Sequence, residues 1–337
     1  MSIEQKKPII AITMGDPAGI GPEITISAML NADMHTYCHP LVIGSGKVLE
    51  RTAKAINKSC TIHRIACPDE ATYRIGIINV IETGSYAEDS IRMGEIQELA
   101  GRMSYDWILK SIELGMSGKI DGVNSAPISK QAIKLAGVAE AGHQEIFRVK
   151  TGSPYTLVMF SCRKLRVFML SGHMSLIDAC HYVTKNNIAR TLVLINRELN
   201  KMGLDKPLIA VSALNPHLGD LGLFGNEEVD QIIPAIQEAR EMGINAIGPI
   251  PADSIYHLGE DGDFAAILSL YHDQAHIACK TLDFEKSCAI TFGLPFIRGT
   301  VDHGVAFDIA GKGIANPSSL IETTRVLAEI ALKQKRI

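Results

Sequence analysis

Three histidines in this chain could together bind a metal ion. They are His173, His217 and His272, and each follows an apolar segment at a turn-like sequence, SGH, NPH or YH. Ligands of open α/β sheets gather beyond the carboxyl ends of the strands, so imidazoles placed there can meet around one divalent ion. Three neutral imidazoles with an open position fit zinc or a similar first-row metal. Because their long separations match no local motif, a structural role stays the alternative for each histidine.

A second candidate site is the glycine-rich segment TVDHGVAFDIAGKGIANP, residues 300–317. Its glycines permit backbone conformations and close approaches that other residues do not. Its polar groups could contact a ribose or a purine. The candidate contacts are Asp302, His303, Gly304, Asp308, Gly311 and Asn316. A plain surface loop is the alternative, because glycine, aspartate and asparagine are ordinary turn residues.

Alternating apolar and amphipathic segments are typical of a parallel or mixed sheet covered by helices, the α/β class. We expect strands at 9–14, 40–44, 75–81, 121–125, 156–160, 166–170, 209–212 and 265–270. We expect helices at 22–30, 48–57, 94–115, 129–135, 176–185, 188–202 and 227–242. The chain is long enough for two α/β domains. We predict that residues 1–127 and 298–337 form domain 1 and that residues 128–297 form domain 2.

The composition predicts a cytoplasmic protein that binds neither nucleic acid nor membrane. The net charge is -4, and the only short basic cluster is at residues 333–336. No segment reaches the roughly 18 uninterrupted apolar residues of a membrane span. The polar start at residues 1–7 leaves no room for a signal peptide before the first strand. The seven scattered cysteines include no C-x-x-C pair, which indicates reduced thiols.

Two loops resemble those of the isopropylmalate and isocitrate dehydrogenase superfamily. GDPAGIGPE at residues 15–23 is similar to its GDGIGPE-type loop, and HGVAFDIAGKGIANP at residues 303–317 is similar to its loop for the adenosine half of NAD. The resemblance implies an isopropylmalate dehydrogenase-like fold, with both termini in one domain and an active-site cleft between the two domains. It also adds Gly15 and Asp16 to the candidate cofactor-binding residues.

Nearly the whole chain resembles the 4-hydroxythreonine-4-phosphate dehydrogenase family of pyridoxal phosphate biosynthesis. The motifs are MGDPAGIGPE (14–23), SAPISK (125–130), GHQEIF (142–147), SGHMSL (171–176), LNPHLGDLGLFGNEE (214–228), GPIPADSIY (248–256), YHDQAHIACK (271–280) and GLPFIRGTVDHG (293–304). The resemblance implies NAD- and divalent-metal-dependent oxidation and decarboxylation of a 4-phosphorylated 3-hydroxy C4 acid. It also implies a homodimer with the active site at the subunit interface, so that one histidine can come from the partner.

The family resemblance assigns the site residues. His173, His217 and His272 become the metal ligands, with zinc expected first and magnesium, manganese or cobalt as alternatives. The substrate contacts become His143, Gln144, Lys280 and Arg298, and residues 302–316 contact NAD. A planar guanidinium such as that of Arg298 suits a bidentate grip on phosphate or carboxylate.

Three side chains are candidates for the chemical steps. Lys280 could balance the carboxylate or protonate the enolate. Asp273, next to a ligand histidine, and Asp253 are candidates for the base or for orienting the metal ligands. Surface salt bridges or helix caps are the alternative roles for these residues.

Two substrate contacts depart from the family pattern. Gln144 stands where the vitamin B6 enzymes usually have threonine, and Ala289 stands where they usually have asparagine. We therefore place a 4-phospho-D-threonate or 4-phospho-D-erythronate dehydrogenase of sugar-acid catabolism second to the hydroxythreonine phosphate enzyme. A metal-dependent phosphohydrolase is the alternative from another class, and the NAD-like loop argues against it.

Overall fold

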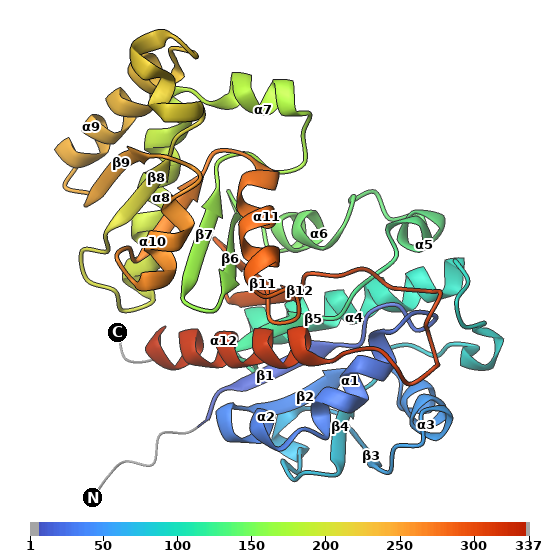
Figure 1. Cartoon of the computed structure of the whole chain (residues 1–337). Helices are drawn as coiled ribbons and strands as arrows, with labels where there is room; N and C mark the ends of the chain where they lie inside the picture. The colour runs from blue at the N-terminus through green and yellow to red at the C-terminus, as the bar shows by residue number, and fades with distance from the viewer. Residues whose placement is uncertain (1–6, 335–337) are drawn as a thin grey trace, which may run out of the picture. The chain divides into compact units, whose positions relative to one another are not determined.

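The computed structural model describes residues 7–334, which form two compact α/β units. The first unit comprises residues 7–156 and 288–334, and the second comprises residues 157–287. The strands of each unit are mostly parallel and are flanked by helices, which confirms the α/β class (Figure 1). Residues 1–6 and 335–337 of the predicted domain 1, with part of the basic cluster at 333–336, lie outside the described residues.

The unit boundaries differ from the predicted domain boundaries at 127/128 and 297/298. Residues 128–156 and 288–297 belong to the first unit and not to the second. Residues 288–297 belong to the first unit because β11 (Cys288–Phe292) pairs antiparallel with β12 (Ile297–Val301). Residues 128–156 belong to it because α5 (Lys130–Leu135) and α6 (His143–Lys150) pack against α4 (Glu98–Met116).

The strands of the first unit lie in the order β3-β4-β2-β1-β5-β12-β11, and all neighbours except β12 and β11 are parallel. The remaining bounds are β1 (Ile9–Thr13), β2 (His39–Ile43), β3 (Thr61–Ile65), β4 (Ile77–Ile81) and β5 (Gly122–Ser125). The central strand β1 is almost wholly buried, as expected for a parallel strand covered on both faces.

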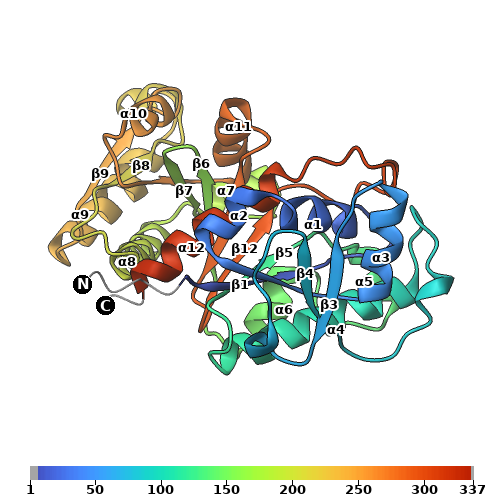
Figure 2. The same ribbon diagram turned by 90° about the horizontal axis from the view of Figure 1, so that it is seen from below.

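Helices cover both faces of these strands (Figure 2). Helices α1 (Gly21–Met29), α2 (Ala32–Tyr37) and α12 (Ser318–Gln334) lie on one face, and α4, α5 and α6 lie on the other. Further helices of this unit are α3 (Gly46–Ala55) and the short η1 (Pro68–Glu70) and η2 (Glu88–Ser90). Asn124 of β5 fixes α12, because its amide donates to Leu320 O at 2.8 Å and Thr324 Oγ1 at 2.9 Å.

The second unit has the strand order β6-β7-β10-β8-β9, in which only β6 and β7 are antiparallel. Its strands are β6 (Leu157–Cys162), β7 (Leu165–Met169), β8 (Ile209–Ser212), β9 (Ala246–Ile250) and β10 (Ala266–Ser269). Its helices are α7 (Leu176–Tyr182), α8 (Lys185–Lys201), η3 (Pro216–Gly222), η4 (Glu228–Ile232), α9 (Ile233–Glu241), α10 (Ile255–Asp261) and α11 (His272–Leu282). Helices α10 and α11 lie on one face of the strands, opposite α8 (Figure 2).

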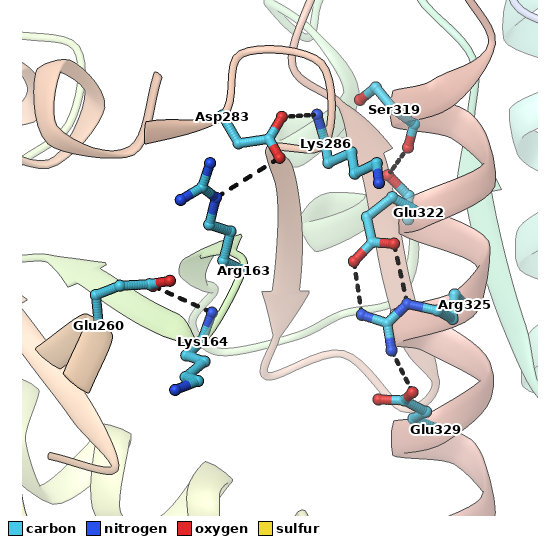
Figure 3. Close-up of polar contacts among 10 residues, drawn as sticks. Arg163, Lys164, Glu260, Asp283, Lys286, Ser319, Glu322, Arg325 and Glu329 are labelled. Carbon is cyan, nitrogen blue, oxygen red and sulfur yellow. Dashed lines mark hydrogen bonds and ion pairs between the residues drawn. The ribbon is translucent and has the colours of Figure 1, made fainter. Parts of the chain in front are cut away.

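Exposed ion pairs support individual elements of both units (Figure 3). In the second unit Asp283, at the end of α11, lies 3.8 Å from Arg163 and accepts a hydrogen bond from Lys286 N. In the first unit Arg325 of α12 pairs with Glu322 and Glu329 on its own helix. Such pairs are each worth about 0–1 kcal/mol, so we assign them local support and no chemistry.

None of the helices within residues 7–334 combines the length and the apolar character that a membrane crossing requires.

The packing of α5 on α4 depends on Gly101. A Cβ built at this glycine would lie 2.0 Å from Ala132 O, and a backbone oxygen cannot give way cheaply. Gly101→Ala should therefore lower the free energy of unfolding by about 1–3 kcal/mol, although alanine favours a helix by about 1 kcal/mol over glycine. Urea unfolding measures the change. Gly304→Ala, where a Cβ would meet nothing within 4 Å, is the control, and equal stabilities of the two variants would contradict the predicted clash.

Candidate active site

Arg298 is a buried cation without a carboxylate partner. Its side chain enters from β12 with 3% of its surface exposed, and it forms no ion pair with any residue between 7 and 334. Nη1 donates to Thr291 Oγ1 at 3.2 Å, and Nε donates to Ser125 Oγ at 3.4 Å. Nη2 is buried without a hydrogen-bond partner in the described chain, and burial lowers the pKa of Arg298 to about 9. An uncompensated buried charge is costly, so this site is suited to an anionic ligand.

His143 and Phe147 face Arg298 from α6. They are one turn apart and so share a face of the helix, and Arg298 Cζ lies 5.2 Å from the centroid of the Phe147 ring. His143 Nε2 is buried without a hydrogen-bond partner in the described chain. Burial holds the pKa of His143 well below its usual range, and the charges of Arg298 and Lys130 act in the same direction. His143 is therefore neutral at pH 7 and can both donate and accept a hydrogen bond.

Lys130 is a residue of this cluster to which the sequence analysis gave no role. It begins α5, is exposed, and forms no ion pair within the described residues. Its chain lies beside Gly142, where a built Cβ would be 3.4 Å from Lys130 Cε. Its place in the motif SAPISK was the only signal in the sequence.

The two residues that depart from the family pattern also lie in the first unit. Gln144 follows His143, and its Nε2 donates to Thr156 Oγ1 at 2.9 Å. Ala289 and Thr291 point to the same face of β11, because they are two residues apart, and Thr291 contacts Arg298. Ala289 is therefore on the strand face that carries the arginine contact.

The glycine-rich loop is attached to the start of the chain by Glu23. This carboxylate is only 1% exposed, and it accepts hydrogen bonds from Gly311 N at 3.0 Å and Ala315 N at 2.8 Å. Ile20 N also donates to Val305 O at 3.0 Å, so the two predicted loops are neighbours. In the sequence, Glu23 was recognised only as the last residue of the motif GDPAGIGPE.

The predicted cofactor contacts in the glycine-rich loop differ from one another in burial and in hydrogen-bond partners. His303 Nδ1 lies 3.0 Å from Gly304 O, and Nε2 is buried without a hydrogen-bond partner among the described residues. Asn316 Oδ1 accepts from Ser318 N, which starts α12. Asp302 is half-buried, Asp308 is exposed, and Gly311 has a positive φ that suits glycine.

Gly15 and Asp16 are packed against the strand end at 126–127. A Cβ at Gly15, where φ is +74°, would lie 2.4 Å from Pro127 O. Asp16 N donates to the same oxygen, and Asp16 Oδ1 accepts from Ala18 N at 2.9 Å. The Asp16 carboxyl is fully buried, and burial raises its pKa to about 6.

One face of α11 in the second unit carries the predicted chemical groups. His272, His276 and Lys280 are four residues apart and so lie in one stripe of the helix. The rings of His272 and His276 stack at 3.9 Å, and the centroid of His173 lies 5.3 Å from that of His272. Asp273 Oδ1 lies 2.6 Å from His272 Nδ1. Burial and the charges of His272, Lys280 and His173 lower the pKa of His276 to about 4.

His217 and Asp253 are not brought into this group. β7, β10 and β8 lie side by side, and His173, His272 and His217 follow these three strands in turn, as the sequence indicated. His217, however, lies in a left-handed turn of exposed residues, and within residues 7–334 no three His, Cys, Asp or Glu side chains are grouped to hold a metal. Asp253 is exposed and accepts a hydrogen bond from Ser254 Oγ.

A parallel α/β fold with a buried, uncompensated arginine is typical of α/β enzymes that bind anionic small molecules. The family model described as "Pyridoxal phosphate biosynthetic protein PdxA" matches residues 36–327, and the chain belongs to this family. A relative from Halalkalibacterium halodurans, named "Putative D-threonate 4-phosphate dehydrogenase", is 44% identical over 326 residues, which cover 97% of this chain and 98% of the relative.

Crystal structures of two 4-hydroxythreonine-4-phosphate dehydrogenases are similar to the whole chain. The protein from Burkholderia phymatum has a TM-score of 0.86 and 39% identity. The protein from Klebsiella pneumoniae has a TM-score of 0.89 and 35% identity. The alignments cover 96% of this chain in both cases, and 98% and 99% of the respective structures. The resemblance found in the sequence is thus confirmed.

Replacing Glu23 should loosen the glycine-rich loop. In Glu23→Gln one acceptor oxygen becomes an NH2 group that faces an amide donor, so one hydrogen bond is lost and two donors oppose each other. We expect hydrogen exchange of the amides of Gly311 or Ala315 to accelerate by tenfold or more, since such a loss costs about 1–3 kcal/mol. Glu145→Gln, which alters only a contact to Ala141 N, is the control. Unchanged protection at residues 311–315 in Glu23→Gln would refute the proposed anchoring.

The buried Asp16 should make stability depend on pH. Its pKa of about 6 in the folded protein is higher than the ordinary value of 3.8, so the folded state holds this proton more tightly. The free energy of unfolding therefore falls as the pH rises from about 4 to about 6. Asp16→Asn removes the charge, and we expect it to be more stable than the parent protein by about 2–3 kcal/mol at pH 7.5. Urea unfolding at pH 5 and 7.5 measures the difference, which should shrink at pH 5. The control Asp308→Asn, at an exposed residue, should show no such pattern. If Asp16→Asn and the parent protein were equally stable at both pH values, the raised pKa of Asp16 would be disproved.

Proposed function

We propose that this protein is an NAD- and divalent-metal-dependent dehydrogenase that oxidises and decarboxylates a 4-phosphorylated 3-hydroxy C4 acid. It is an oxidoreductase of the PdxA family, whose relatives are named dehydrogenases of phosphorylated C4 acids. The observation that carries the substrate class is the buried Arg298, which has no carboxylate partner in residues 7–334 and one buried donor nitrogen without a hydrogen bond.

We place 4-phospho-D-threonate first as the substrate and 4-phosphohydroxy-L-threonine second. The 44% identical relative is named for D-threonate 4-phosphate. Gln144 and Ala289 also support this order, because both stand at substrate contacts implied by the family and both differ from its vitamin B6 enzymes. A hydroxyl in place of an ammonium changes charge and donor geometry, which a few contacts can discriminate.

NAD fits the glycine-rich loop of the first unit. The loop holds a buried imidazole nitrogen, His303 Nε2, without a hydrogen-bond partner in the described chain, and Gly304 has open space where a side chain would stand. We propose that residues 302–316, with Gly15 and Asp16, form the cofactor site. Glu23 acts there as a positioning residue, because it fixes the loop through two backbone amides.

A divalent metal, with zinc first, fits the histidine pair of the second unit. Asp273 holds His272 Nδ1, which leaves Nε2 of that ring as a metal-binding atom, and His173 lies beside it. We propose His217 as the third ligand, supplied by the partner subunit, because it does not join the other two within one chain. A bound divalent ion would supply Lewis-acid polarisation of the substrate hydroxyl.

We assign substrate binding and proton transfer to individual side chains of the two units. Arg298 binds an anionic end of the substrate, and the neutral His143 exchanges a hydrogen bond with a phosphate oxygen or a hydroxyl. Asp273 or Asp253 accepts the proton of the 3-hydroxyl while the hydride on the same carbon leaves for NAD. The bond to the carboxylate then breaks, carbon dioxide leaves, and Lys280 protonates the resulting enolate.

The homodimer and the cytoplasmic location are also proposals. The second unit exposes large apolar side chains on α7 and in the segment after β8, with Ile177 70% and Leu221 97% exposed, as expected of a surface that meets another subunit. All seven cysteines are free, which fits a reducing compartment.

NADH absorbance tests the function. With added zinc, manganese or magnesium, we expect NADH from both C4 acids, with kcat/KM for 4-phospho-D-threonate higher by about tenfold or more. Chelation of the metal should abolish the signal. The double variant Gln144→Thr, Ala289→Asn should shift the ratio of the two kcat/KM values toward 4-phosphohydroxy-L-threonine. Phosphate release without NADH would instead identify a phosphohydrolase.

A further inference from the structure

The cation cluster of the first unit contains a residue that the proposed reaction has not yet used. Arg298, His143 and Lys130 lie at the carboxyl end of β5 and beside α6, with the hydroxyls of Ser125 and Thr291 on the guanidinium. Arg298 is fixed by these hydroxyls and by Phe147. Lys130 belongs to α5, and its side chain lies close to the residue before His143: a Cβ built at Gly142 would be 3.4 Å from Lys130 Cε.

Charge counting distinguishes the possible occupants of this cluster. A carboxylate carries one negative charge, which Arg298 alone balances. A phosphate monoester carries about -1.5 to -2 at pH 7, which needs a second cation. His143 is not that cation, since burial and its neighbours keep it neutral. Lys130 forms no ion pair in the described chain, and its Cε lies beside Gly142, the residue before His143. Lys130 can therefore supply the second positive charge.

We propose that Lys130 contacts substrate and, with Arg298, binds the phosphate end of the C4 acid. The inference rests on the proposed function for the identity of the substrate, while the binding of a phosphate monoester dianion by this cluster stands on its own. Lys130 is thereby a determinant of phosphorylated over unphosphorylated acids.

Calorimetric titration of the full-length protein with methyl phosphate and with acetate tests the proposal. We expect Lys130→Met to weaken methyl phosphate binding about tenfold, as for the loss of one charged hydrogen bond, and to change acetate binding by less than twofold. Lys130→Arg should recover most of the affinity. Lys119→Met removes the same charge at the opposite end of β5 and should change neither ligand, and circular dichroism checks that each variant is folded.

A kinetic readout separates this proposal from the proposed function. In turnover of 4-phospho-D-threonate, Lys130→Met should raise KM about tenfold and leave kcat within about twofold, because the lost contact exists before and during the reaction. If the parent protein turns over the C4 acid but Lys130→Met changes neither KM nor methyl phosphate binding, the role of Lys130 is refuted and the function stands. If methyl phosphate binding depends on Lys130 but no C4 acid is oxidised, the phosphate site stands and the function is refuted. An equal loss of acetate and methyl phosphate would overturn the assignment of the phosphate end.

Discussion

The burial of the Arg298 guanidinium, which has no counterion among residues 7–334, is the constraint that organises the first unit. Arg298 can lie inside only because three elements converge on it: β5 through Ser125, β11 through Thr291 and α6 through Phe147. Hydroxyls and an aromatic face solvate the charge partially but do not neutralise it, so the folded protein retains a preference for an anion. The same three elements carry or adjoin His143, Gln144 and Ala289, the residues that we propose as determinants of substrate choice.

The glycine-rich loop is held by a buried anion instead of a buried cation: the Glu23 carboxylate accepts hydrogen bonds from backbone amides of the loop. Glu23 takes up two amide protons of residues 311–315, so a loop without regular structure acquires a fixed attachment to α1. Amides near the loop that are not used in this way stay available to a ligand, whereas those bound to Glu23 do not. This attachment joins the two segments GDPAGIGPE and HGVAFDIAGKGIANP, although nearly the whole chain separates them in sequence.

Sequence patterns predicted most of the central strands well, but they did not predict the pairing of strands that are distant in sequence. β1, β5, β8 and β10 were predicted within about a residue, because each is a short apolar run between turn residues. β11, β12 and α12 were not predicted, and β12 belongs beside β5, a pairing of residues more than 170 positions apart that no local pattern encodes. The two compact units differ from the predicted domains for the same reason, since the strand pairs that define them join distant segments. Within the candidate site, Arg298 was identified from the family motifs and His272 from its turn after an apolar segment, but Lys130 and the role of Glu23 emerge only from tertiary contacts.

The distribution of the site residues explains how paralogues of this family can change substrate. His173, His272 and Lys280, to which we assign the metal and the proton transfer in the proposed function, all belong to the second unit, and Asp273 contacts His272 from the neighbouring position on α11. Gln144 and Ala289 belong to the first unit, where their replacement leaves the histidine face of α11 untouched. Under the proposed function, substitutions at residues 144 and 289 should therefore alter recognition of the C2 substituent and leave the side chains of α11 unchanged. In the pair Gln144 and Thr156 the threonine hydroxyl accepts from the amide nitrogen, so the amide oxygen can accept a hydrogen bond from a ligand hydroxyl.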